Sequence, residues 1–197
     1  MRVFISGGCK NGKSYYAQRL AKQQAKGKEL YYIATMAPVD PEDDERILRH
    51  QKEREGWGFA TIEQQKDIRN ILNTCDCGAS FLLDSLTALL GNEMFLEDGS
   101  VNTQAHEKIW SELLEILNKV ENIVIVSDYM YSDADIYDPL TEMYRKHLAG
   151  LDRLAAKQSD VVLEAAYNQI IAHKGGDVFY EACERMPGGV LHVPRYV

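Results

Sequence analysis

The sequence predicts an α/β fold with a mostly parallel sheet and helices on both faces. Short continuous apolar runs, typical of buried parallel strands, alternate along the chain with longer segments of helical periodicity. Several runs end in Ser, Thr or Asp, and the first leads into a glycine-rich segment that ends in Lys-Ser. Because parallel strands bring their carboxyl ends to one edge of the sheet, a ligand site is expected at that edge.

The first half of the chain predicts four strands, at residues 3–5, 29–35, 61–63 and 80–84. The third is short enough to be an edge strand, and the fourth is continuously apolar, as in a central strand. Helices are expected at residues 15–25, 42–55, 66–73 and 86–95. The second of these is highly charged, with Ile47 and Leu48 as its apolar anchors, and Gly56-Trp57-Gly58 ends it.

The second half continues the alternation of helices and strands. A polar loop is expected at residues 96–102, helices at 103–120 and 139–158, and strands at 122–127 and 160–164. Both helices have apolar residues spaced three and four apart, which predicts one buried face for each. In the tail, residues 170–172 and 188–193 are expected to form a C-terminal β-hairpin.

Composition restricts the class of protein. With 197 residues, 45% of them hydrophobic, the chain can form one domain over residues 1–197. Its net charge of −8 argues against a nucleic-acid partner. No apolar run is long enough to span a membrane, and the N-terminus has strand character rather than that of a signal peptide. The four cysteines lack a disulfide or zinc spacing, so a cytoplasmic protein is expected.

The segment after the first strand matches G-x-x-x-x-G-K-[ST] at all four fixed positions. Its residues are Gly7, Gly8, Cys9, Lys10, Asn11, Gly12, Lys13 and Ser14. The glycines let backbone N–H groups face phosphate oxygens, Lys13 supplies a cation for the β- and γ-phosphates, and Ser14 supplies a hydroxyl for Mg²⁺. A chance glycine turn is disfavoured because the segment lies between a strand and a helix. The motif therefore predicts binding of a nucleoside triphosphate, GTP or ATP.

A phosphate-binding loop needs a carboxylate near the bound Mg²⁺, at the end of a neighbouring strand. Asp84 is the best placed candidate, and Asp128, which also ends an apolar run, is the second. The alternative is that either acid only caps the turn or helix that follows.

His50 lies in a basic stretch with Arg46, Arg49, Lys52 and Arg54. On spacing alone this is a solvated helix face. The functional alternative makes His50 a nucleophile or a phosphate contact within a basic patch on an acidic protein.

Five features together resemble the bifunctional adenosylcobinamide kinase/adenosylcobinamide-phosphate guanylyltransferases of cobalamin biosynthesis. They are Gly7 to Ser14, Tyr32-Ile33-Ala34-Thr35, Arg46-Ile47-x-x-His50 with Arg54, Thr61-x-Glu63, and Leu82-Leu83-Asp84-Ser85-Leu86-Thr87. The resemblance extends over about residues 1–163, is specific up to Thr87 and looser beyond it, and implies a P-loop NTPase-like fold.

The resemblance also implies a two-step activity. The family phosphorylates the aminopropanol hydroxyl of adenosylcobinamide, then moves GMP from GTP onto a histidine and on to cobinamide phosphate. His50 matches that histidine. Positions around the guanine nucleotide match Ala34, Thr35, Met36, Gln51, Lys52, Glu53, Arg54, Glu63 and Asp84. The implied partners are a nucleoside triphosphate with Mg²⁺, a corrinoid, and further copies of the chain in a homo-oligomer such as a trimer.

Three positions depart from the family pattern. Glu55 replaces a proline, the run from Ser127 to Tyr131 replaces one that contains Asn-Glu-Val-Gly, and Asp152-Arg153 replaces Asn-Gln. These changes lie where the acceptor side and subunit contacts are expected. Two alternatives therefore stay open, namely a P-loop kinase or nucleotidyltransferase for another small acceptor, and a nucleotide-binding regulatory protein with little turnover.

Overall fold

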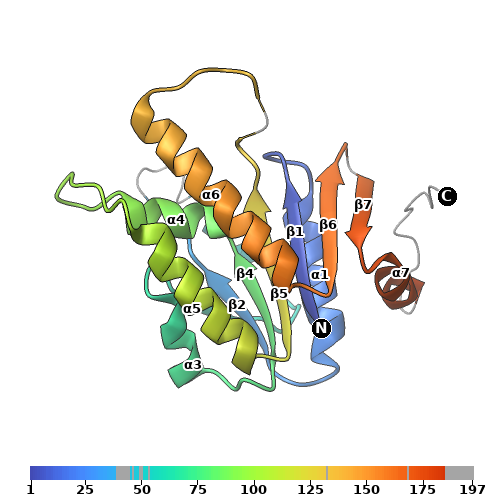
Figure 1. Cartoon of the computed structure of the whole chain (residues 1–197). Coiled ribbons are helices and arrows are strands. Elements are labelled where there is room, and N and C mark those ends of the chain that lie inside the picture. Colours follow the sequence, from blue (N-terminus) through green and yellow to red (C-terminus); the bar gives the residue numbers. More distant parts are fainter. Residues whose placement is uncertain are drawn as a thin grey trace.

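A seven-stranded sheet forms the centre of the part of the chain that the structure describes (Figure 1). The structure is a computed structural model and describes residues 1–38, 45, 47–48, 51–52, 54–131, 133–167 and 169–184. Its strand order is β3-β2-β4-β5-β1-β6-β7. The strands are β1 (Arg2–Gly7), β2 (Leu30–Ala34), β3 (Ala60–Glu63), β4 (Ser80–Asp84), β5 (Asn122–Asp128), β6 (Val161–Ala166) and β7 (Gln169–Lys174). Neighbouring strands are parallel except β6 and β7, which are antiparallel.

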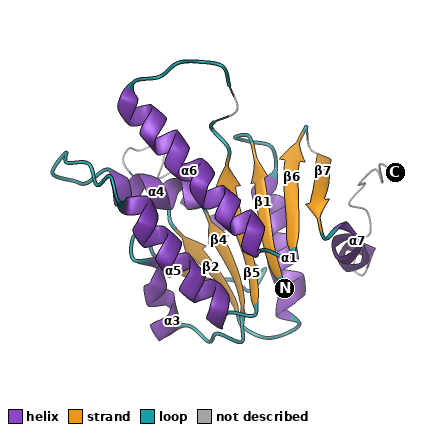
Figure 2. Ribbon diagram, in the orientation of Figure 1, coloured by secondary structure: helices purple, strands orange, loops and turns teal. Residues whose placement is uncertain are grey.

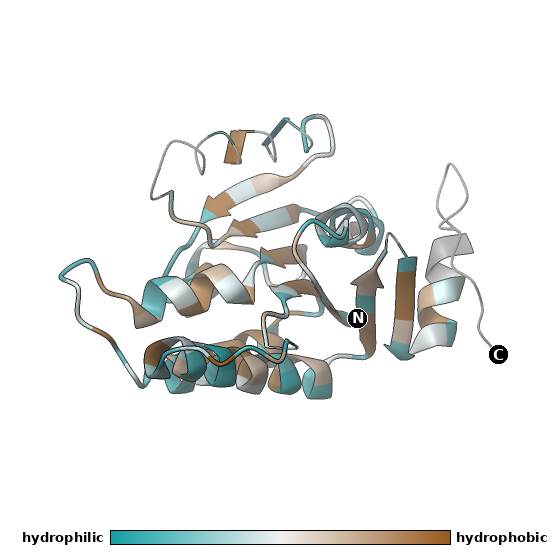
Figure 3. Cartoon of the chain, turned by 90° about the horizontal axis from the view of Figure 1, so that it is seen from above, coloured by the Kyte–Doolittle hydropathy of each residue, from teal (hydrophilic) through white to brown (hydrophobic). Residues whose placement is uncertain are grey.

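Helices cover both faces of the sheet, as the sequence predicts (Figures 2 and 3). One face packs against α1 (Lys13–Ala25) and against Phe179 of α7 (Gly176–Glu184). The other face packs against α4 (Leu86–Met94), α5 (Ala105–Lys119) and α6 (Pro139–Gln158), with a 3₁₀ turn (Ile68–Asn70) and α3 (Ile71–Thr74) beside them. The central strands β4 and β5 are therefore buried on both sides, which accounts for their continuous apolar sequence.

Helix periodicity predicts the buried faces correctly. In α5, Ile109, Leu113 and Ile116 are fully buried against the sheet, at the predicted spacing of three and four. Helix α6 has the predicted bounds because Asp138 accepts hydrogen bonds from the backbone N–H groups of Leu140 and Thr141, with a proline in the first turn. Of the helix predicted at 42–55, the described residues at positions 45, 47–48 and 51–52 are helical.

The structure has a C-terminal hairpin, which is formed by β6 and β7. Residues 170–172 belong to β7, which pairs with β6, and residues 188–193 lie outside the described residues. The chain reverses at Tyr167, whose φ of 52° gives a tight turn directly after β6. The sequence analysis also missed α7, whose Phe179 is buried beside β6. Among the described residues, no helix is long and apolar enough to cross a membrane.

A buried carboxyl group lies where α6 packs on the sheet. Asp152 is only 3% exposed and accepts a hydrogen bond of 2.7 Å from the hydroxyl of Tyr131. Burial raises the pKa of Asp152 from 3.8 to about 6, and hydrogen bonds from Ser127 and Tyr131 only partly oppose this. An ionised Asp152 is therefore a destabilising group in the folded protein.

We predict that Asp152→Asn stabilises the fold in a pH-dependent way. The carboxyl group of Asp152 binds its proton more tightly in the folded protein than in the unfolded chain. The free energy of unfolding therefore falls as pH rises from 3.8 to about 6. The asparagine can still accept from Tyr131 but never ionises. Denaturant unfolding should show a gain of about 1–3 kcal/mol near pH 8 and little gain near pH 4. An equal effect at both values would contradict the shifted pKa.

Candidate functional site

The glycine-rich loop joins β1 to α1 and lies against the end of β6. A side chain at Gly7 would place its Cβ 2.4 Å from the carbonyl oxygen of Ala165, so no larger residue fits there. Gly12 has a φ of 78° at the start of α1, in the left-handed region that glycine adopts without strain. Asn11 Nδ2 donates a hydrogen bond of 3.4 Å to the carbonyl of Ala165. The loop is therefore held in place by its backbone and by β6.

Lys13 begins α1 and is almost completely buried, with 5% of its surface exposed. Its Nζ donates a hydrogen bond of 2.6 Å to the carbonyl of Gly8 and forms an ion pair of 2.6 Å with Asp128 Oδ1. A buried ammonium requires such partners. The cation that the motif assigns to phosphate is thus paired with protein oxygens here.

Asp84 lies at the other side of the loop, at the end of β4. Ser14 Oγ donates to Asp84 Oδ2 over 3.2 Å, and the Tyr32 hydroxyl donates to the same oxygen over 2.9 Å. The hydroxyl and the carboxylate that the sequence predicts for Mg²⁺ are therefore brought together. Among the described residues no group of three or more His, Cys, Asp or Glu could hold a metal ion. Ser14 and Asp84 nonetheless fit Mg²⁺, which usually takes few protein ligands and adds water and phosphate oxygens.

A cavity of about 210 Å³ opens between Asp84 and the ends of β2 and β3. Its walls include six of the residues predicted around the nucleotide, namely Ala34, Met36, Gln51, Arg54, Glu63 and Asp84. The remaining lining residues are Tyr32, Pro38, Ile47, Thr61 and Gln65. Residues that the sequence places far apart thus share one wall next to the loop.

Four other predicted residues, Thr35, Lys52, His50 and Glu53, either do not line this cavity or fall outside the described structure. Thr35 is fully buried and serves the backbone: its Oγ1 accepts from the N–H of Ser85 over 2.7 Å and donates to the Ser85 carbonyl over 2.8 Å. Lys52 is exposed and absent from the cavity wall. His50 and Glu53, like Arg46 and Arg49 in the same basic stretch, lie outside the described residues.

Arg54 and Tyr32 connect the cavity to Asp84. The guanidinium carbon of Arg54 lies 3.5 Å from the centroid of the Tyr32 ring, and Arg54 is 7% exposed. Its Nη1 is buried without a hydrogen-bond partner among the described residues. A buried guanidinium with an unused donor suits an anion or a carbonyl-bearing base. Tyr32 was missed as a site residue because, in sequence, it is one apolar position of a buried strand.

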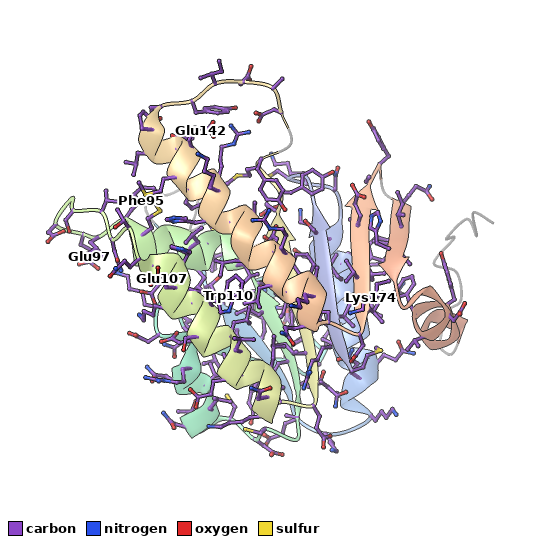
Figure 4. All side chains as sticks on the ribbon, in the orientation of Figure 1. Phe95, Glu97, Glu107, Trp110, Glu142 and Lys174 are labelled. Carbon is purple, nitrogen blue, oxygen red and sulfur yellow. The ribbon has the colours of Figure 1, made fainter. Side chains whose placement is uncertain are left out.

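The segment after β5, where the sequence departs from the family pattern, is held over the carboxyl edge of the sheet by α6. Arg145 is 7% exposed and donates from Nε to the carbonyl of Met130 over 3.0 Å. Its two other nitrogens contact Glu142 at 2.7 Å and Asp133 at 2.8 Å. Figure 4, where Glu142 is labelled, shows this start of α6 projecting beyond the sheet. The segment therefore borders the site on the side of Asp128.

Comparison with known proteins shows the family and the fold. The family described as cobinamide kinase / cobinamide phosphate guanyltransferase matches residues 3–168. The bifunctional adenosylcobalamin biosynthesis protein CobP of Pseudomonas aeruginosa is 32% identical over 130 residues, which cover 65% of this chain and 71% of that protein. A KaiC-like protein of Pyrococcus horikoshii shares the fold, with a TM-score of 0.50 at 12% identity over 88% of this chain and 79% of the other. The chain belongs to the cobinamide kinase / cobinamide phosphate guanyltransferase family.

Proposed function

We propose that this protein phosphorylates the aminopropanol hydroxyl of adenosylcobinamide and then transfers GMP from GTP to the product through His50. The observation that carries the proposal is that the loop and the cavity adjoin and share Asp84. Family membership supports a kinase and transferase of cobalamin synthesis. Two neighbouring subsites are what an enzyme needs if it both transfers a γ-phosphate and retains a nucleoside monophosphate.

In the kinase step, the loop backbone and Lys13 would hold the triphosphate. Lys13 Nζ would exchange its contacts with Gly8 and Asp128 for phosphate oxygens. Ser14 and Asp84 would hold Mg²⁺, which neutralises charge on the phosphates when bound. The protein then contributes mainly position and charge, which accounts for most of the catalysis of phosphoryl transfer.

In the guanylyl step, the cavity would hold the guanine nucleotide. Glu63 can accept hydrogen bonds from the amino edge of guanine, and Arg54 can donate to a base carbonyl or a phosphate. His50 directly precedes Gln51 and follows Ile47 by three residues, and both of these line the cavity. We propose that an imidazole nitrogen of His50 bonds to the α-phosphorus while the bond to pyrophosphate breaks. A phosphate oxygen of the acceptor then displaces the histidine.

We predict that Asp84→Asn lowers the rate of γ-phosphate transfer by orders of magnitude and raises the Mg²⁺ concentration needed for half-maximal rate. The substitution keeps the side-chain shape but removes the charge next to Ser14. Asp98→Asn is a matched control because Asp98 lies in an exposed loop. Steady-state rates across a Mg²⁺ titration provide the measurement. An unchanged Mg²⁺ dependence in Asp84→Asn would remove Asp84 from the metal site.

His50→Ala should abolish covalent labelling of the protein by GTP labelled at the α-phosphate. Transfer of γ-label to cobinamide should persist, because that step needs the loop and Lys13 but no nucleophilic histidine. Lys13→Ala is the complementary variant and should lose the γ-transfer. The adduct should be acid-labile and base-stable, as expected for a phosphoramidate. An adduct mapped by mass spectrometry to His106, His147 or His173 would contradict the assignment, and a protein that neither labels nor transfers would be a binding protein.

Arg54→Lys should weaken GTP binding about 5- to 30-fold, although the charge is conserved. Lysine can neither stack flat on Tyr32 nor present two donors in one plane. Lys52→Met is the control, because Lys52 is two residues from Arg54 and its side chain does not line the cavity. It removes a positive charge and should change GTP affinity little. Equilibrium binding of GTP to both variants measures the difference. A larger loss of GTP affinity in Lys52→Met than in Arg54→Lys would indicate that the nucleotide binds outside this cavity.

A further inference from the structure

The two carboxylates at the edge of the sheet have different surroundings. Asp84 pairs in register with Val126 of β5, so Asp128 lies two residues farther along on the same face. Asp128 is in register with Gly7, where β1 enters the loop. As a result Asp84 meets Ser14, while Asp128 meets the ammonium group of Lys13.

This position places Asp128 at the end of the triphosphate where the γ-phosphate would bind. The lysine of this motif reaches the β- and γ-phosphates, and Asp128 Oδ1 is 2.6 Å from its Nζ. The side chain of Asp128 is 22% exposed, against 6% for Lys13, so it is reachable from the acceptor side. A carboxylate beside the phosphates repels them and would weaken nucleotide binding unless it has a task in the reaction.

The backbone of Asp128 is fixed by two helices. Its N–H donates to Thr87 Oγ1 over 2.8 Å, and the hydroxyl of Tyr144 in α6 donates to the Thr87 carbonyl over 2.8 Å. The next residue, Tyr129, donates its N–H to the carbonyl of Gly7 over 3.2 Å. The carboxylate is thus supported from α4, α6 and the loop, as a group that must be placed precisely requires.

We propose that Asp128 is the general base of the phosphoryl transfer, an inference that rests on the kinase step proposed above. Without nucleotide, Lys13 neutralises Asp128; when the triphosphate binds, Lys13 turns to the phosphates and frees the carboxylate. The acceptor hydroxyl oxygen then bonds to the γ-phosphorus as its proton passes to Asp128. The bond between the γ-phosphorus and the bridging oxygen breaks, and the nucleoside diphosphate leaves with that electron pair.

The test is Asp128→Asn, compared with Asp128→Glu and the wild type in transfer of γ-label to cobinamide. We expect kcat to fall about 100-fold or more in the asparagine variant, because it cannot accept a proton. The KM for the nucleotide should stay equal or fall, because Lys13 loses its competing ion pair. Asp128→Glu should recover part of kcat. Asp98→Asn, which changes an acid in an exposed loop, should leave kcat within about twofold and serves as the control.

Each of the following outcomes would contradict the role of Asp128 as the general base. If Asp128→Asn keeps its kcat and only binds nucleotide more tightly, Asp128 merely holds Lys13. If its kcat loss is restored by higher Mg²⁺, Asp128 is a metal ligand instead. If Asp128→Glu is as slow as Asp128→Asn while both melt like the wild type, proton transfer to a carboxylate at this position is excluded. If the wild type transfers no γ-label to cobinamide, the proposed kinase function fails, and the base fails with it.

Discussion

The ion pair between Lys13 and Asp128 is the contact around which the site is arranged. It joins the start of α1 to the end of β5, and both groups lie in a largely desolvated position. Lys13 is 5% exposed, and its ammonium group would be strongly destabilising without a partner. The ion pair with Asp128 compensates for the cost of burying this charge. The same contact implies that a bound triphosphate must replace Asp128 as the counter-ion of Lys13.

The register of the parallel strands gives Asp84 and Asp128 different contacts. In register with Val126, Asp84 lies closer to the sheet and shares its oxygen with Ser14 and Tyr32. Asp128 extends two residues farther and contacts Lys13, so in the proposed reaction it would face the γ-phosphate. A metal-binding carboxylate and a proton-accepting carboxylate can thereby lie on either side of one phosphate chain without competing for it. The cavity beside Asp84 adds a second place for a nucleotide moiety, reached through Tyr32 and Arg54.

Two of the three departures from the family pattern lie where we expect the acceptor to bind, in the segment after β5 and in α6. Arg145 holds the segment after β5 through the Met130 carbonyl and two acidic side chains. The neighbouring Asp152 is buried under the same segment and bonded to Tyr131. The run from Ser127 to Tyr131 and the replacement at Asp152 are therefore directly connected. Divergence there can alter the acceptor while the loop, Ser14 and Asp84 keep the arrangement that nucleotide chemistry needs.

The sequence by itself determined the elements and the motif. Continuous apolar runs predicted the buried strands, and spacing of three and four predicted the inner faces of the helices and the range of α6. The resemblance carried by residues 7–87 identified the family. These features depend on local preference and on residues close together in the chain, which a sequence displays directly.

Only the tertiary structure decided which distant groups meet. Asp84 and Asp128 have the same local pattern, an acid after an apolar run, and the strand register alone assigns one to Ser14 and the other to Lys13. Stacking of Arg54 on Tyr32 joins residues from separate elements. The pairing of β7 with β6 follows from a turn at Tyr167. Such contacts depend on strand order and on which faces pack together, and neither is encoded within a short stretch of sequence.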